Sequence, residues 1–302
     1  MNRINVRPLD WGRGVFGGAL AVAGLIFSFV VGTASAQIYT LSSGNSSVSI
    51  NPYSSAGMES WIVDGQNQLN QQWFWYRTGN SGPVASIDTI SAPVVSWLSD
   101  YSILSITYAD SLFSINLLFS LVGGASGSGA SDLSEQISIQ NLTSSKQTID
   151  FFQYADFNLG GTPNNDTGQL DQSGRMYTGV VQYNSPGCMV SENVDTAVSH
   201  PANYAEIGTG SGATSTILNS FGNPSFTHLN DQNDGPPNGG NINWGLEWDT
   251  TIAGGGTYII SKDLNLSGVV PVPVPEPSAG SLILLGVLAG GMWKFRSARR
   301  AN

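Results

Sequence analysis

The sequence of 302 residues contains one cysteine, Cys188, and two histidines, His200 and His228. A single cysteine excludes an internal disulfide, so an exported domain of this size would depend on its hydrophobic core for stability. Cys188 is followed by the apolar residues Met189 and Val190, with no basic residue beside it to activate a thiolate. This environment predicts a core residue rather than a nucleophile.

Basic side chains are scarce between the two ends of the chain. Only Arg77, Lys146, Arg175 and Lys262 are basic between residues 37 and 277, whereas all of the 21 acidic residues except Asp10 lie there. A strongly negative domain repels phosphate backbones and attracts cations. Nucleic acid is therefore excluded as a partner.

Helical periodicity is missing between the two ends, and alternation of period two is present instead. From Phe113 to Leu121 every second residue is large and apolar, and Ser or Asn occupies several of the intervening positions. Similar short segments recur, separated by loops rich in Gly, Asn, Asp and Ser. Residues 37–268 are predicted to form one all-β ectodomain, a large antiparallel β-sandwich of jelly-roll-like type.

The N-terminus has the order of a secretory signal. Arg3, Arg7 and Arg13 precede an apolar run over residues 15–31, and the small residues Ala34 and Ala36 follow. The sequence therefore predicts a helical signal peptide over residues 1–36, cleaved by signal peptidase before Gln37. A permanent membrane anchor is the alternative.

The C-terminus has a second tripartite arrangement. A Pro-rich spacer over residues 269–280 contains Val274, Pro275, Glu276 and Pro277, and an apolar segment follows. Residues 281–302 are predicted to form a short transmembrane helix and a basic tail. The basic residues of the tail are Lys294, Arg296, Arg299 and Arg300.

This tail resembles the PEP-CTERM sorting signal, which exosortase recognises in Gram-negative bacteria that make exopolysaccharide. The resemblance covers only about the last 30 residues, and an unrelated anchor beside a chance Pro-Glu-Pro is the alternative. The resemblance implies export through the secretion machinery, a precursor in the inner membrane with the domain outside the cytoplasm, removal of the tail, and a mature form at the cell surface or in the matrix.

The densest aromatic cluster includes Trp73, Trp75 and Tyr76. Exposed tryptophans can stack on sugar rings, which makes these residues candidates for carbohydrate binding, whereas a central strand buried on both faces has the same appearance. Residues 73–77 read Trp-Phe-Trp-Tyr-Arg, and this short motif loosely resembles segments of other PEP-CTERM proteins.

Two acidic loops are candidate calcium sites, because Asp and Asn supply the hard oxygen ligands that calcium prefers. One loop contains Asp166 and Asp171, and the other contains Asp231 and Asp234. Neither has EF-hand spacing, and ordinary turns use the same residues. No other cofactor is expected.

Motifs for catalysis are absent: there is no Gly-x-Ser-x-Gly elbow, no His-Glu-x-x-His and no phosphate loop. No catalytic residue can be assigned from the sequence. The sequence therefore favours a non-enzymatic surface or matrix protein associated with exopolysaccharide or biofilm. The alternative is a secreted carbohydrate-binding module or a glycan-active hydrolase on a β-sandwich.

Overall fold

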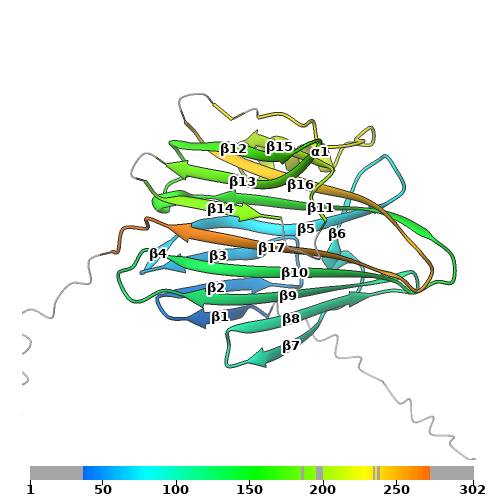
Figure 1. Cartoon of the computed structure of the whole chain (residues 1–302), viewed down its shortest axis with the longest axis horizontal. Helices are drawn as coiled ribbons and strands as arrows, with labels where there is room; N and C mark the ends of the chain where they lie inside the picture. The colour runs from blue at the N-terminus through cyan, green and yellow to red at the C-terminus, as the bar shows by residue number, and fades with distance from the viewer. Residues whose placement is uncertain (1–36, 185–186, 195–199, 234, 237–238, 273–302) are drawn as a thin grey trace, which may run out of the picture. The chain divides into compact units, whose positions relative to one another are not determined.

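The computed structural model describes residues 37–272, apart from 185–186, 195–199, 234 and 237–238. Two β-sheets make up most of this part of the chain (Figure 1). Every strand pair is antiparallel except a short parallel contact of β3 with β5 at Gln72. The prediction of an all-β sandwich is confirmed at this level.

The first sheet has the strand order β1-β2-β3-β5-β11-β16-β15, with two short strands at its side. Its members are β1 (Tyr39–Ser43), β2 (Ser46–Asn51), β3 (Gly57–Val63), β4 (Gln66–Asn67), β5 (Leu69–Thr78), β6 (Ala85–Ser86), β11 (Gln147–Phe157), β15 (Tyr204–Thr209) and β16 (Ile242–Ile252).

The second sheet has the order β12-β13-β14-β17-β10-β9-β8-β7. Its members are β7 (Val94–Ser99), β8 (Ile103–Ala109), β9 (Phe113–Gly123), β10 (Ser131–Asn141), β12 (Asp166–Ser173), β13 (Met176–Asn184), β14 (Met189–Asn193) and β17 (Thr257–Ser267). The helical segments are η1 (Ile87–Thr89), η2 (Leu159–Gly161), η3 (Gly212–Thr214) and α1 (Thr216–Phe221).

The second sheet shows the alternation expected from the sequence. On β9, Ile115, Leu117 and Phe119 are buried, whereas the residues between them are partly exposed. Strand β10 has the same pattern and pairs with β9 along its whole length. One face of this sheet therefore forms half of the core, and the other faces solvent.

The central strands of the first sheet, β5, β11 and β16, are buried on both faces over most of their length. One face packs against the second sheet. The other is covered near β15 and β16 by α1 and the segment after it, where Phe221 lies 5.5 Å from Trp75 and 5.3 Å from Phe152 between ring centroids (Figure 1). Ser215 caps α1 by accepting a hydrogen bond from the Leu218 N–H.

A buried cation lies between the sheets. Lys262 on β17 forms ion pairs with Glu135 on β10 and, at 3.2 Å, with Glu192 on β14. The Gln72 side chain of the first sheet donates to Glu135 at 2.5 Å, and Gln153 donates to Glu192 at 2.8 Å. A buried ion pair contributes little net stability but fixes the pairing of its partners, since breaking it leaves a charge without compensation.

No helix among the described residues is long and apolar enough to cross a membrane. The predicted helices at residues 1–36 and 281–302 lie outside the described residues, so they stay predictions.

Candidate functional site

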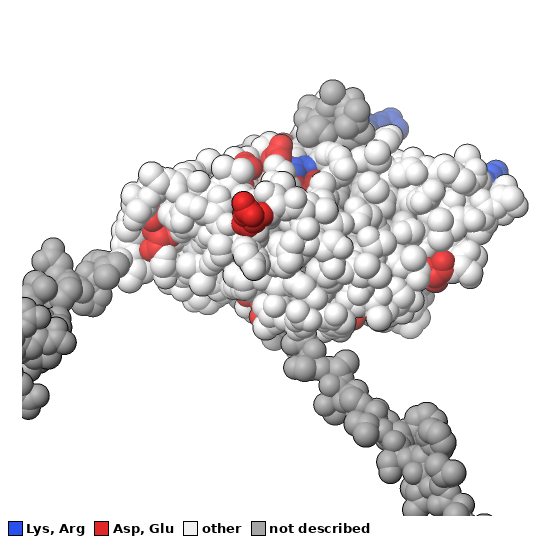
Figure 2. Space-filling view, turned by 90° about the horizontal axis from the view of Figure 1, so that it is seen from below, with Lys and Arg blue, Asp and Glu red and all other residues white. Residues whose placement is uncertain are grey.

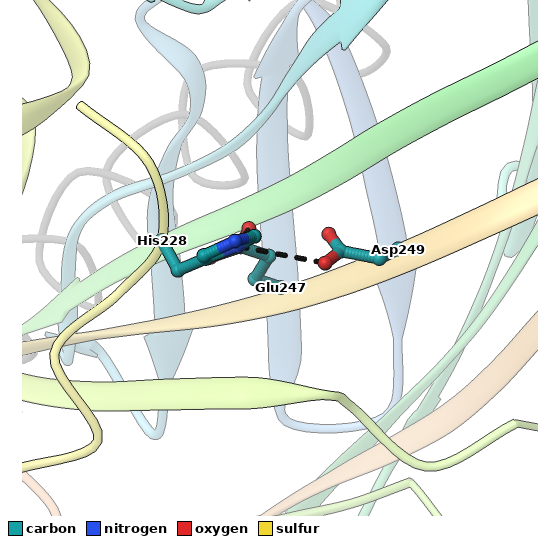
Figure 3. A group of neighbouring side chains, drawn as sticks. All are labelled: His228, Glu247 and Asp249. Carbon is teal, nitrogen blue, oxygen red and sulfur yellow. Dashed lines mark hydrogen bonds and ion pairs between the residues drawn. The ribbon is translucent and has the colours of Figure 1, made fainter. Parts of the chain in front are cut away.

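Three ionisable side chains meet on the outer face of the first sheet (Figure 3). Glu247 and Asp249 are two residues apart on β16, and side chains at this spacing project from the same face of a strand. His228 comes from the segment between α1 and β16, and its Nδ1 atom lies 2.9 Å from Glu247 Oε1 and 3.5 Å from Asp249 Oδ2. The fold thus places the imidazole of a loop residue, His228, next to the carboxyl groups of two strand residues, Glu247 and Asp249.

Glu247 lies beneath the imidazole and is fully buried. Its Oε2 accepts a hydrogen bond of 2.8 Å from the Leu229 N–H, and Arg77 Nη2 lies 4.0 Å from its Oε1. Burial raises the pKa of Glu247 to about 9, since the charged form loses its hydration. At neutral pH the Glu247 carboxyl therefore holds a proton that it can share with His228 or with Asp249.

His228 is held from two sides. Its ring stacks on Tyr204 of β15, with centroids 4.2 Å apart and planes inclined by 18°. Its Nδ1 atom faces the two carboxyls, which leaves Nε2 as the nitrogen that can act on a ligand. The side chain keeps 32% of its surface exposed, so a small molecule can reach it.

Arg77 anchors the floor of this region. It lies on β5 opposite Asp150 of β11, and its Nε and Nη2 atoms donate to Asp150 Oδ2 at 3.0 and 2.7 Å. Its remaining donors bind the carbonyl oxygens of Gly82, Phe226 and Thr227. These carbonyl contacts tie the loop that carries His228 to the sheet.

A pocket of about 310 Å³ opens beside these residues. This volume is at the lower end of the range for small-molecule sites, about 300–1,000 Å³. Its walls combine hydroxyl, amide, carboxyl and ring groups: Asn80, Thr148, Asp150, Tyr204, His228, Asp249, Thr250 and Thr251. Such a lining suits a ligand with several hydroxyl groups.

The aromatic residues expected to bind sugar lie elsewhere. Trp73 is fully buried, and Trp75 is 7% exposed, between Tyr154 and Phe221. Tyr76 is half-buried against Phe113 of the second sheet. Of the two interpretations left open by the sequence, the strand buried on both faces is the one observed, because both faces of β5 are covered.

The predicted calcium ligands are dispersed. Asp166 is buried and accepts a hydrogen bond of 2.7 Å from Gln182, and Asp171 is partly exposed at a distorted part of β12. Asp231 accepts from the Ala205 N–H, and Asp234 lies outside the described residues. In the part of the chain that the structure describes, the one group of three potential metal-ligating side chains is His228, Glu247 and Asp249.

Gln37 is exposed at the start of the described chain. The other residues of the two processing signals lie outside the described residues: Ala34, Ala36, Val274, Pro275, Glu276, Pro277, Lys294, Arg296, Arg299 and Arg300. Cys188 is buried, as expected, and burial raises the pKa of its thiol.

Sequence reasoning noted His228 but gave it no role. Its partners are 19 and 21 positions away, and only the pairing of β16 with β11 and β15 brings them to the pocket. The Glu247-x-Asp249 spacing was the available signal, because in a strand it places two carboxyls on one face.

No family model and no curated protein matches the sequence. Among solved structures, the described fold is similar to a galactose mutarotase related enzyme from Lactobacillus acidophilus, with a TM-score of 0.51 and 8% identity over 79% of this chain and 100% of that one. A putative aldose 1-epimerase from Escherichia coli K12 gives a TM-score of 0.49 and 10% identity over 76% of this chain and 98% of that one. A galactose mutarotase-like protein from Lactobacillus casei gives a TM-score of 0.49 and 7% identity over 76% of this chain and 100% of that one.

These comparisons correct the expectation of a non-enzymatic matrix protein. The solved structure with the highest of these scores is that of a galactose mutarotase related enzyme, whereas the sequence had favoured a non-enzymatic protein. At 8% identity the likeness shows the fold alone. The described domain is similar in fold to a galactose mutarotase related enzyme.

Proposed function

We propose that this protein is a carbohydrate-active enzyme that binds a single sugar unit in the His228 pocket and acts on it by proton transfer. One observation carries the proposal: a buried Glu247, whose pKa burial raises, lies 2.9 Å from an accessible imidazole at the edge of a small pocket rich in hydroxyl groups. General acid–base catalysis needs an ionisable group of this kind within hydrogen-bonding reach of a ligand.

The Glu247–His228 pair can deliver and recover a proton. When Nε2 donates its proton to a sugar oxygen, Nδ1 takes the proton of Glu247, so the imidazole stays neutral and the charge moves to the buried carboxylate. Arg77, 4.0 Å from Glu247, stabilises that charge. His228 is thus the catalytic group, and Glu247 is a positioning residue that also stores the proton.

Anomerisation of a free aldose is the reaction to test first. It requires a proton on the ring oxygen, supplied by His228, and transfer of the O1 proton to water, so that the C1–O5 bond opens; the reverse transfers close the ring on either face of C1. The fold is similar to that of a galactose mutarotase related enzyme from Lactobacillus acidophilus, which favours this reaction class. The second candidate function is binding of a sugar without turnover, because the same hydrogen-bonding pocket lining suits a binding protein and an enzyme.

The experiment is exchange spectroscopy of the α and β anomers of galactose and glucose, with the full-length protein. The wild type is expected to accelerate exchange, and His228→Asn to reduce the acceleration by about 100-fold or more, the usual contribution of a general acid or base. His200→Asn is the matched control, because His200 does not line the pocket and its ring stacks on Tyr258. Wild-type exchange equal to that of buffer would refute turnover, and sugar-dependent shifts without acceleration would support binding alone.

The terminal signals add a proposal about location. In this proposal the domain is exported, and exosortase removes the tail at the Pro275-Glu276-Pro277 motif. The jelly-roll-like connectivity and the two terminal helices also stay predictions. Proline keeps this segment extended and readable by a processing enzyme. Replacing the three residues by alanine should leave an uncut precursor in the inner membrane. Tail peptides in the mature surface form, found by mass spectrometry, would contradict this proposal.

A further inference from the structure

The charges around the pocket are unbalanced. Two carboxyl side chains, Asp150 and Asp249, line it together with His228, and no lysine or arginine does among the described residues. The nearby cation, Arg77, has only 3% of its side chain exposed and directs its donors to Asp150 and three backbone carbonyls. Arg77 therefore compensates Asp150 and is unavailable to a ligand. On the face shown in Figure 2, acidic side chains form small separate groups and basic ones are few.

Asp249 is the pocket carboxylate that has no lysine or arginine partner among the described residues, and its side chain interacts with His228 and Glu247 instead. Its Oδ1 atom is buried and has no hydrogen-bond partner among the described residues, although the side chain as a whole is 28% exposed. Its Oδ2 atom is 3.5 Å from His228 Nδ1, which is closer to Glu247. Asp249 also lies directly opposite Asp150 in the pairing of β16 with β11, and like charges in this arrangement repel.

The other pocket walls are neutral hydrogen-bonding groups. Thr148 and Thr251 place their hydroxyl oxygens 3.1 Å apart across the two strands, and Asn80 adds an amide. These groups match sugar hydroxyls, whereas Asp249 matches a positive charge. A ligand that carries hydroxyls and one ammonium group on the same small ring satisfies both.

From this arrangement we infer that the pocket takes an amino sugar with a free amine, whose ammonium group pairs with Asp249. This inference rests on the proposed function and names its substrate class. Uronic acids and sugar phosphates are disfavoured, because Asp249 would repel them. A charge-assisted hydrogen bond to Asp249 would distinguish a hexosamine from the corresponding neutral hexose.

The test is calorimetric titration of the full-length protein at mildly acidic pH with glucosamine, glucose, N-acetylglucosamine and glucuronate. Glucosamine is expected to bind at least about tenfold more tightly than glucose, the ratio that corresponds to one charge-assisted contact of roughly 1.4 kcal/mol. N-acetylglucosamine retains the ring but loses the charge, so it should bind no better than glucose. Glucuronate should bind most weakly.

Asp249→Asn should abolish the preference for glucosamine over glucose. Asp100→Asn, which removes an exposed charge in the turn between β7 and β8, is the matched control and should keep the preference. Equal affinity of the wild type for glucosamine and glucose would overturn the inference while leaving the proposed function intact. Absence of binding by every sugar would overturn both.

A divalent cation at the same residues is the competing occupant. Titrations after treatment with a chelator, and with added calcium or zinc, separate the two. If chelation abolishes sugar binding and either ion restores it, a metal compensates Asp249, and the inference is overturned. If chelation leaves the preference for glucosamine unchanged, the amine is the compensating group.

Discussion

Asp166 provides a quantitative test of the buried-carboxyl chemistry. Its side chain is fully buried at the start of β12, where Oδ2 accepts from Gln182 and Oδ1 has no partner among the described residues. Burial raises the pKa of Asp166 from 3.8 to about 7. The folded protein therefore keeps a proton on Asp166 that the unfolded chain releases at a much lower pH.

The sign and size of the effect follow from linkage. Between pH 4 and pH 7 the folded state binds more protons at Asp166 than the unfolded state, so the free energy of unfolding falls as the pH rises. About three pH units at roughly 1.4 kcal/mol each give a loss of about 4 kcal/mol between pH 4 and pH 8. Asp166→Asn, which keeps the shape and removes the ionisation, should lack this loss.

Urea denaturation from pH 4 to pH 8, followed by tryptophan fluorescence, measures the difference. The stability of Asp166→Asn relative to the wild type should improve by about 4 kcal/mol across this range. Subtracting the two curves cancels contributions of the same sign from Asp156 and Glu247, whose pKa values burial also raises. Exposed Asp100→Asn is the control and should parallel the wild type. Parallel curves for Asp166→Asn and the wild type would refute the reasoning.

Three further predictions follow from the same structure. Lys262→Met should lower the free energy of unfolding in urea by about 3–5 kcal/mol, because it leaves Glu135 and Glu192 buried without their cation, and a loss below about 1 kcal/mol would contradict this. Trp73→Ala should cost about 3–5 kcal/mol through the cavity it creates, and the remaining folded protein should bind sugar as the wild type does. Wild-type activity should decline as the pH rises through about 9, where Glu247 loses its proton. Glu247→Gln should be slower but should lack that decline. If the activity of both proteins declines over the same alkaline pH range, Glu247 is not the source of the decline.

The sequence was informative where one face of a strand meets water. On β9 and β10 the two-residue alternation predicted both the strands and their buried side chains, because only one face of that sheet is covered. On β5, β11 and β16 the same reasoning could not distinguish aromatic side chains buried in the core from an exposed, sugar-binding surface. Both faces are buried there, and burial by α1 and the segment after it depends on contacts between residues about 70 to 150 positions apart.

The candidate site depends on the same long-range contacts. Arg77, Asp150, His228 and Glu247 come from four separate segments, and no local spacing connects them. Lys262 appeared in the sequence as one of a few basic residues, without any sign that it is buried between the sheets. Charged residues inside a β-sandwich have the same local pattern as charged residues on its surface, so their positions emerge only from the sheet order.

A crystal structure of the full-length protein with a bound monosaccharide tests the central claim most directly. The account predicts one sugar ring in the pocket beside Tyr204, with a sugar oxygen within hydrogen-bonding distance of His228 Nε2 and the Thr148 and Thr251 hydroxyls on other ring substituents. A sugar bound only elsewhere on the domain, with His228 Nε2 facing solvent, would contradict it.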